Sequence, residues 1–112
     1  MLENRIKIEV LVGSRSNGNY PLMNFEGQIA FIFNTIADFK DNGGNYFEVN
    51  GRFKGKSDEK AYQLNFYCEK SDFMDLIEHT KSTFNNIKPE GVKYVSIKSY
   101  EVESYSFEVS SE

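Results

Sequence analysis

Two residue types that often perform catalysis occur once each in this sequence, as His79 and Cys68. His79 lies in a segment with helical spacing, and its neighbours one turn away, Asp75 and Thr83, are polar, which predicts a solvated position. Acid–base catalysis by histidine requires a positioned partner, and the sequence indicates none. Cys68 falls on the apolar face of a predicted strand, where nothing nearby in the sequence would lower its pKa. We therefore expect a buried structural cysteine and a protein that is not an enzyme.

Phosphate-loop and metal chemistry have little support in the sequence. The segment 13–18 is rich in glycine and serine and follows a predicted strand, but it lacks the lysine and the following helix of a phosphate-binding loop. No spacing of His, Cys, Asp and Glu matches a metal site. A single cysteine provides neither a disulfide framework nor a thiolate cluster. We expect neither a metal ion nor a cofactor.

Residues 45–56 form the densest aromatic and basic segment of the chain. In a strand, alternation places Tyr46 on the same face as the cations at positions 52, 54 and 56. The same alternation turns Phe47 and Phe53 toward the core, where we expect them to reach the edge of the binding groove formed by this strand face. Flat rings beside cations suit unstacked bases and their phosphates. A polar strand face with Arg and Lys is equally typical of a solvated surface, so both interpretations stay open.

Three further residues extend this candidate binding surface. Arg15 and Tyr20 lie in a polar loop over residues 13–24, and long loops in compact domains are often functional. Tyr67 lies on the polar face of a neighbouring predicted strand. The complete set that we expect to bind nucleic acid is Arg15, Tyr20, Tyr46, Phe47, Arg52, Phe53, Lys54, Lys56 and Tyr67.

Length and composition indicate one soluble globular domain over residues 1–112. Hydrophobic residues make up 39% and charged residues 27% of the chain, which fits a folded protein. The longest apolar run, residues 29–33, is too short to span a bilayer, and the first residues lack the apolar stretch of a signal peptide. We therefore expect a cytoplasmic protein, in the host cytoplasm if it is viral, without a membrane partner.

The net charge of −4 is unevenly distributed. Acidic and basic residues balance over residues 1–60, and the acidic excess falls in residues 61–112. An acidic total argues against a general binder of duplex DNA, which presents a broad basic face. It is compatible with one local basic groove in the first half of the chain.

The elements that position these residues follow from hydrophobic periodicity. We predict strands over residues 5–12, 28–35, 46–53 and 61–68, with turns at 41–45 and 55–59. A helix over residues 71–88 follows, with Ser71 as its N-cap and Pro89 and Gly91 as its stop signal. Two closing strands are predicted over 92–98 and 104–109, with a bulge or tight turn between them. This order predicts a mainly β protein with one helix, as an OB-like small antiparallel β-barrel, or alternatively an α+β antiparallel sheet packed on one helix.

At the level of pattern, the chain resembles bacterial and bacteriophage single-stranded DNA-binding proteins of the OB-fold type. The resemblance rests on the alternating opening strand at 6–13, the apolar segment 28–34, the strand 62–70 leading into 71–77, and the closing pattern 105–109. Small proteins of lactic-acid-bacterium phages are the nearest kind. The resemblance implies sequence-tolerant binding of single-stranded DNA in phage replication or recombination, beside other proteins of those processes and without catalysis.

The acidic second half supports a different hypothesis, a small phage-type protein–protein inhibitor or adaptor, such as an anti-defence protein or a DNA mimic. Its supporting residues are Asp72, Asp75, Glu78, Glu101, Glu103 and Glu108. Leu11, Ala30 and Ile32 are apolar on the second faces of their predicted strands. They mark either a sheet covered on both sides or the surface of a dimer or larger homo-oligomer.

Overall fold

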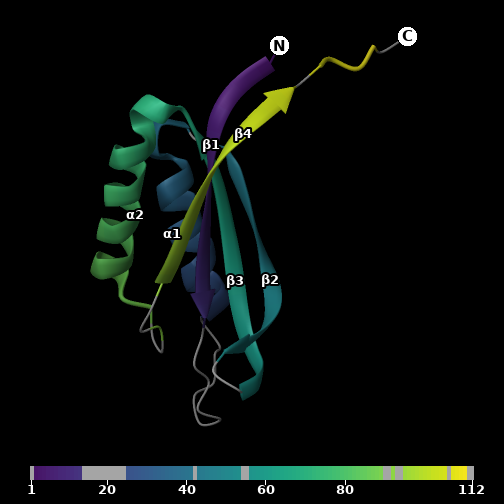
Figure 1. The fold of residues 1–112 in the computed structure, drawn as a ribbon. Coiled ribbons are helices and arrows are strands. Elements are labelled where there is room, and N and C mark those ends of the chain that lie inside the picture. Colours follow the sequence, from purple (N-terminus) through teal and green to yellow (C-terminus); the bar gives the residue numbers. More distant parts are fainter. Residues whose placement is uncertain are drawn as a thin grey trace.

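Strands and helices follow one another in the order β-α-β-β-α-β (Figure 1). The structure, a computed structural model, describes residues 2–13, 25–41, 43–53, 56–89, 92, 95–105 and 107–110, and describes the backbone alone for residues 2, 3, 25, 41, 50–53 and 56–60. The elements are β1 (Leu2–Gly13), α1 (Phe25–Ala37), the 3-10 turn η1 (Phe39–Asp41), β2 (Gly44–Phe53), β3 (Lys56–Cys68), the 3-10 turn η2 (Lys70–Asp72), α2 (Phe73–Ile87) and β4 (Val95–Tyr105).

The strands form one antiparallel sheet in the order β2-β3-β1-β4. This arrangement is the ferredoxin-like split β-α-β fold. The sheet is open, with β2 and β4 as its edges, and does not close on itself. The expected OB-like barrel is therefore not supported. The coarser alternative, an antiparallel α+β fold, is correct, although the sheet packs on two helices where the sequence indicated one.

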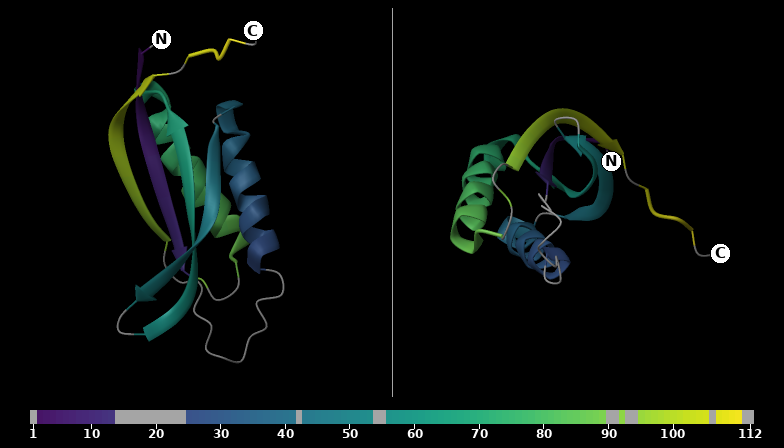
Figure 2. Two further views of the ribbon diagram at one scale, coloured as in Figure 1. Left: turned by 90° about the vertical axis from the view of Figure 1, so that its right-hand side faces the viewer. Right: turned by 90° about the horizontal axis from the view of Figure 1, so that it is seen from below.

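Both helices cover the same face of the sheet (Figure 2). The core lies between them and this face, because alternate residues of β1 and β3 point toward the helices. The connected core cluster of buried apolar side chains contains Ile8, Val10, Val12, Tyr62, Leu64, Phe66 and Cys68 from the strands, and Ile29, Ile32, Ile36, Leu76 and Phe84 from the helices. Within the described residues, no helix packs on the opposite face, which we call the open face (Figures 1 and 2).

The segment 28–35, predicted as a strand, lies inside helix α1. Ile29, Ile32 and Ile36 are fully buried at helical spacing, whereas Phe31 is 62% exposed. A short apolar run does not distinguish a buried strand from a helix by periodicity. The β-branched isoleucines favoured the prediction of a strand, but packing of this segment on the sheet stabilises a helix. Phe31 is therefore on the surface, and the three buried isoleucines form the contact stripe of α1.

Other boundaries also moved relative to the sequence prediction. The expected turn at 55–59 overlaps β3, which begins at Lys56, and β2 carries a register shift between Gly51 and Phe53. The two predicted closing strands are one strand, β4, paired with β1 without interruption from Val95 to Tyr105. The predicted helix is confirmed as η2 and α2, but Asp72 and not Ser71 is the N-cap of α2.

Gly44 marks the point where the chain enters the sheet against the core. A Cβ atom there would collide with the carbonyl oxygen of Asn65 and lie 3.2 Å from Phe66 and 3.3 Å from Phe33. At Gly27, within α1, a Cβ atom meets nothing within 4 Å. Close packing therefore requires glycine at position 44, whereas position 27 has room for a larger side chain.

We predict that Gly44→Ala lowers the free energy of unfolding by about 1–3 kcal/mol, because the backbone must shift to admit the methyl group. Gly27→Ala should raise it by about 0.5–1 kcal/mol, since alanine loses less entropy in a helix. Urea denaturation followed by circular dichroism measures both. Equal stability of the two variants would contradict this packing.

Candidate nucleic-acid interface

The first aromatic pair of β2 faces opposite to the sequence prediction. Tyr46 packs toward the helices, with its ring centroid 4.9 Å from that of Phe33, whereas Phe47 is 45% exposed on the open face. The register with β3 explains this orientation, because Tyr46 lies opposite the buried Leu64 and Phe47 lies opposite Gln63. The expected stacking role of Tyr46 is therefore incompatible with its position, and Phe47 takes the exposed place.

The remaining predicted residues divide into two groups. Tyr67 is half-buried in β3, and pairing opposite Lys7 puts it on the open face, as the sequence indicated. Arg52, Phe53 and Lys56 lie in β2 and β3, where their backbone is described. Arg15, Tyr20 and Lys54 lie outside the described residues. The structure thus brings Tyr67 and Phe47 to one face, and the basic positions 52 and 56 to the β2–β3 hairpin (Figure 1).

A row of three side chains crosses the open face on neighbouring strands. Lys7 of the central strand β1 lies opposite Tyr67 of β3 on one side and opposite Tyr100 of β4 on the other. Residues directly opposite in a sheet point to the same face, so the two rings flank the ammonium group at roughly 10 Å across three strands. Tyr100 is 44% exposed. The row presents two aromatic surfaces with a cation between them.

The charge of Lys7 is held in place by its neighbours. Its Nζ lies 3.1 Å from an Oε of Glu9, and the Tyr100 hydroxyl donates to Glu9 at 3.2 Å. The hydrogen bond to Glu9 raises the pKa of Lys7, and the nearby phenols of Tyr67 and Tyr100 raise it further. Lys7 therefore stays protonated at neutral pH. Lys98, opposite Glu9 on β4, adds a second exposed cation to this face.

Amide side chains form a second row beside the aromatic one. The Gln63 Nε2 group donates to Asn65 Oδ1 at 2.9 Å, and Asn65 Nδ2 donates to Asn45 Oδ1 at 2.9 Å. Asn65 lies at the centre of this row and is only 4% exposed, and the outer groups of Asn45 and Gln63 have no partner among the described residues. Amide groups in this position can hydrogen-bond the edges of unpaired bases.

Sequence reasoning missed Lys7, Tyr100 and Lys98 because their proximity depends on strand order. The available signal was the alternation of β1, because burying Ile8, Val10 and Val12 on one face directs Lys7 to the other. The sequence alone did not show that β4 lies next to β1. It also did not show that, among the described residues, no helix covers this face of the sheet. The candidate site is therefore centred on β1, β3 and β4. It depends less on residues 45–56, which the sequence indicated as the main binding segment.

The two residues considered for catalysis occupy structural positions. Cys68 is 2% exposed, and burial, with a smaller contribution from Asp72, raises the pKa of its thiol against an opposing effect of Arg5. His79 is half-buried between the helices, stacked on Phe39 at 4.5 Å, and its Nε2–H donates to the Thr35 carbonyl at 3.2 Å. The predicted solvated position of His79 was therefore wrong, because α1 covers that flank of α2.

Several acids that favoured the inhibitor hypothesis have cationic partners. Lys40 Nζ lies 2.8 Å from Asp72 and 3.3 Å from Asp75. Glu101 is paired with Lys70 at 2.8 Å, and Glu78 with Lys81 at 3.6 Å. These pairs reduce the negative potential along α2 and β4, so the acidic face is weaker than the sequence suggests. An acidic inhibitor or adaptor stays a prediction without support from this geometry.

The described segments also limit two other kinds of site. They contain no group of three or more His, Cys, Asp or Glu side chains arranged to hold a metal ion. In the same segments, no helix is long and apolar enough to cross a membrane.

No protein-family model matches the chain, and no curated protein matches it. Solved structures share its fold. The de novo designed protein Foldit4 is 10% identical, over 86% of this chain and 96% of that one, with a TM-score of 0.56. A phage SAM lyase in its apo state is 18% identical over 92% of both chains, with a TM-score of 0.53. A putative PII-like signaling protein from Thermus thermophilus is 9% identical, over 92% of this chain and 90% of that one, with a TM-score of 0.51.

These similarities concern the fold alone. A designed protein, a lyase and a signaling protein share the architecture while their described roles differ, as is common for a widely used fold. They are not OB-fold proteins, which agrees with the open sheet.

We predict that Cys68 reacts with a thiol reagent at least about 100-fold more slowly in the folded protein than in urea, because the buried thiol is neutral and inaccessible. Its raised pKa adds stability that is complete below the ordinary thiol pKa and is lost as pH rises through the folded value. Absorbance-monitored modification at about pH 7.5 and pH 9, on either side of the ordinary thiol pKa, measures the rates. Equal rates with and without urea would contradict the burial.

Proposed function

We propose that this protein binds single-stranded nucleic acid, most directly single-stranded DNA, across its open sheet face without catalysis. The observation that carries the proposal is the row Tyr67–Lys7–Tyr100 on three neighbouring strands. Open four-stranded sheets with exposed rings bind single strands by stacking bases, while nearby cations contact the phosphates. In this proposal, Tyr67 and Tyr100 stack bases and Lys7 contacts the backbone between them.

Neighbouring residues extend the same surface. Phe47 offers a third exposed ring on β2, and Asn45 and Gln63 offer amide groups to base edges. The described side chains of the open face include three cations, Arg5, Lys7 and Lys98, against the carboxylate of Glu9. An acidic protein can therefore present a locally positive strip.

The proposal predicts that Tyr67→Ala and Tyr100→Ala each weaken the binding of a fluorescein-labelled oligo-dT by about tenfold to 100-fold, because each removes a stacking surface. Tyr67→Phe should bind like the wild type, because phenylalanine retains the ring. Lys7→Ala should lower the slope of log affinity against log salt by about one. Fluorescence anisotropy between about 50 and 300 mM salt measures these effects.

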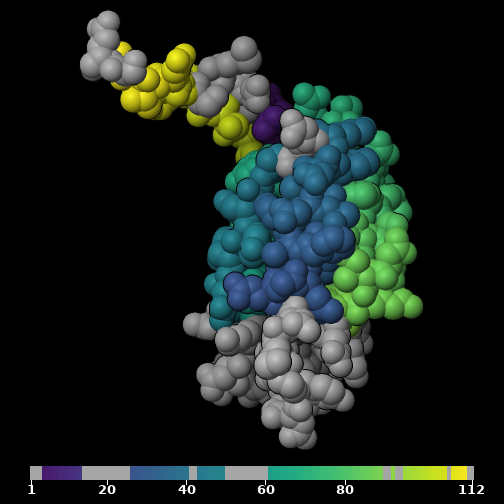
Figure 3. Space-filling view, turned by 180° about the vertical axis from the view of Figure 1, so that it is seen from behind, coloured from purple at the N-terminus to yellow at the C-terminus, as the bar shows by residue number. Residues whose placement is uncertain are grey.

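Matched controls lie on the helix side of the molecule, which faces the viewer in Figure 3. Phe31→Ala removes a ring that is 62% exposed on α1, and Lys81→Ala removes an exposed cation from α2. Both should leave the affinity and the salt slope unchanged. The proposal fails if the wild type does not bind at micromolar concentration, or if the helix-side variants weaken binding as much as the tyrosine variants.

A further inference from the structure

Glu9 places a negative charge in the middle of the open face, beside the row that is proposed to bind nucleic acid. The sheet register puts it opposite Asn65 of β3 and opposite Lys98 of β4, and Lys7 precedes it on the same face of β1. A carboxylate in this position repels the phosphates of a bound strand. Its contribution to binding therefore has to come from contacts with other parts of a nucleotide.

The carboxylate of Glu9 is fixed at the hydroxyl end of a stacking ring. The Tyr100 hydroxyl donates to Glu9 Oε2 at 3.2 Å, and Lys7 Nζ lies 3.1 Å from Glu9 Oε1. A carboxylate has roughly four lone-pair sites, so these two contacts leave it able to accept further hydrogen bonds. The Glu9 side chain is 24% exposed and can be reached from outside. A base stacked on Tyr100 therefore has one edge beside the remaining acceptor sites of Glu9.

Lys98 supplies a hydrogen-bond donor next to this acceptor. It lies two positions before Tyr100 on the same face of β4 and directly opposite Glu9. Its side chain is exposed, and it has no ion-pair partner within the described part of the chain. The open face thus presents a carboxylate and an ammonium group side by side, at one end of an aromatic ring.

We infer that these three side chains recognise guanine, so that the protein prefers single strands containing this base; the inference rests on the proposed function. Proteins recognise unpaired bases through their Watson–Crick edges. This edge of guanine carries two adjacent donors, N1–H and N2–H, followed by the O6 acceptor. Glu9 accepts from both N–H groups and Lys98 donates to O6, while Tyr100 stacks on the base.

The other three bases fit this arrangement less well. Adenine and cytosine each place a ring-nitrogen lone pair beside the amino group, and thymine has a single N–H between two carbonyl oxygens. Because a carboxylate accepts hydrogen bonds and cannot donate them, each of these bases turns an acceptor toward Glu9. An acceptor that faces another acceptor costs binding free energy, so Glu9 discriminates against these bases as well as binding guanine.

Competition anisotropy measures the preference, with a short fluorescein-labelled oligo-dT as the probe and competitors that differ from it in one central base. The wild type should bind the strand with one dG about tenfold more tightly than oligo-dT or the strand with one dA. Deoxyinosine retains N1–H and O6 but lacks the N2 amino group. The affinity for the deoxyinosine strand should therefore lie between those for the dG strand and oligo-dT.

Glu9→Gln separates recognition from structural support, because glutamine keeps the length of the side chain but replaces one acceptor oxygen by an N–H donor. This variant should bind the dG strand no better than the deoxyinosine strand. Its affinity for oligo-dT should stay the same or rise, since a negative charge is removed. If Glu9 only held Lys7 and Tyr100 in place, the variant would bind all strands more weakly to the same degree.

Lys98→Met tests the contact with O6. It should lower the affinity for the dG strand and for the deoxyinosine strand relative to oligo-dT, because both purines carry this oxygen. An unchanged preference for the two strands in this variant would overturn the role of Lys98.

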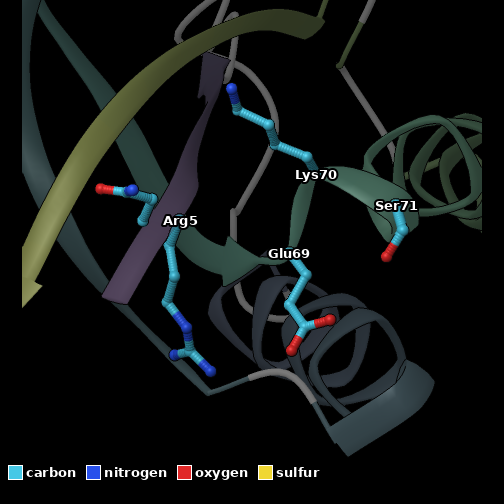
Figure 4. Close-up of a pocket in the computed structure, with 5 residues that line it drawn as sticks. Arg5, Glu69, Lys70 and Ser71 are labelled. Carbon is cyan, nitrogen blue, oxygen red and sulfur yellow. The ribbon is translucent and has the colours of Figure 1, made fainter. Parts of the chain in front are cut away.

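Glu101→Gln is the matched control, since it removes the same charge from the position next to Tyr100. Glu101 lies opposite Ile6 on the helix side of the sheet and is paired with Lys70 at 2.8 Å. Lys70 lines a polar cavity of about 430 Å³, where Figure 4 shows it projecting to the opposite side from Arg5 and Glu69. The control variant should keep the preference of the wild type for dG.

The outcomes distinguish this inference from the proposed function. Binding of oligo-dT without a preference for dG overturns the inference and leaves the proposed function in place. A preference for dG that survives Glu9→Gln, or that is lost equally in Glu101→Gln, also overturns it. Absence of binding to every strand overturns the proposed function and the inference together.

Discussion

The pairing of β1 on both of its sides is the constraint on which the rest of the structure depends. β1 is hydrogen-bonded to β3 and β4 over long, continuous registers, and its alternate residues Ile8, Val10 and Val12 are fully buried. Because side chains alternate along a strand, burying this set under the helices directs Lys7 and Glu9 to the other face. A one-residue slip of β1 would move charge into the core. The same pairing therefore sets the core and the open face.

The sequence predicted most where alternation was clean. β1, β3 and α2 each carry one apolar face, and their existence and type are confirmed, although β3 begins at Lys56, earlier than predicted. The sequence predicted the structure less well where apolar residues occur on both faces of a segment. The run 29–33 fits a strand or a helix, and Tyr46 beside Phe47 offers an aromatic residue to either face of β2. In both places tertiary contacts set the outcome: packing on the sheet for α1, and contact of Tyr46 with Phe33 of α1 opposite Leu64 of β3 for β2.

The candidate site depended on information that no local pattern holds. Lys7, Tyr67 and Tyr100 are separated by tens of residues and meet because β1 lies between β3 and β4. Tyr67 was predicted as an exposed ring from the parity of its own strand, and its placement on the open face matches the structure. The net acidity of the chain also obscured the site, because several acids are paired with lysines on the helix side while the described cations of the open face outnumber its described carboxylate.

Chemical-shift mapping of the ¹⁵N-labelled protein with unlabelled oligo-dT is the most direct test of whether the open sheet face binds single-stranded DNA. We expect the largest shift changes on the open-face residues of β1, β3 and β4, at Lys7, Tyr67 and Tyr100 and their neighbours. The helix-face positions Phe31, Met74 and Lys81 should stay unchanged. Changes concentrated on α1 and α2, or none at millimolar oligonucleotide, would contradict it.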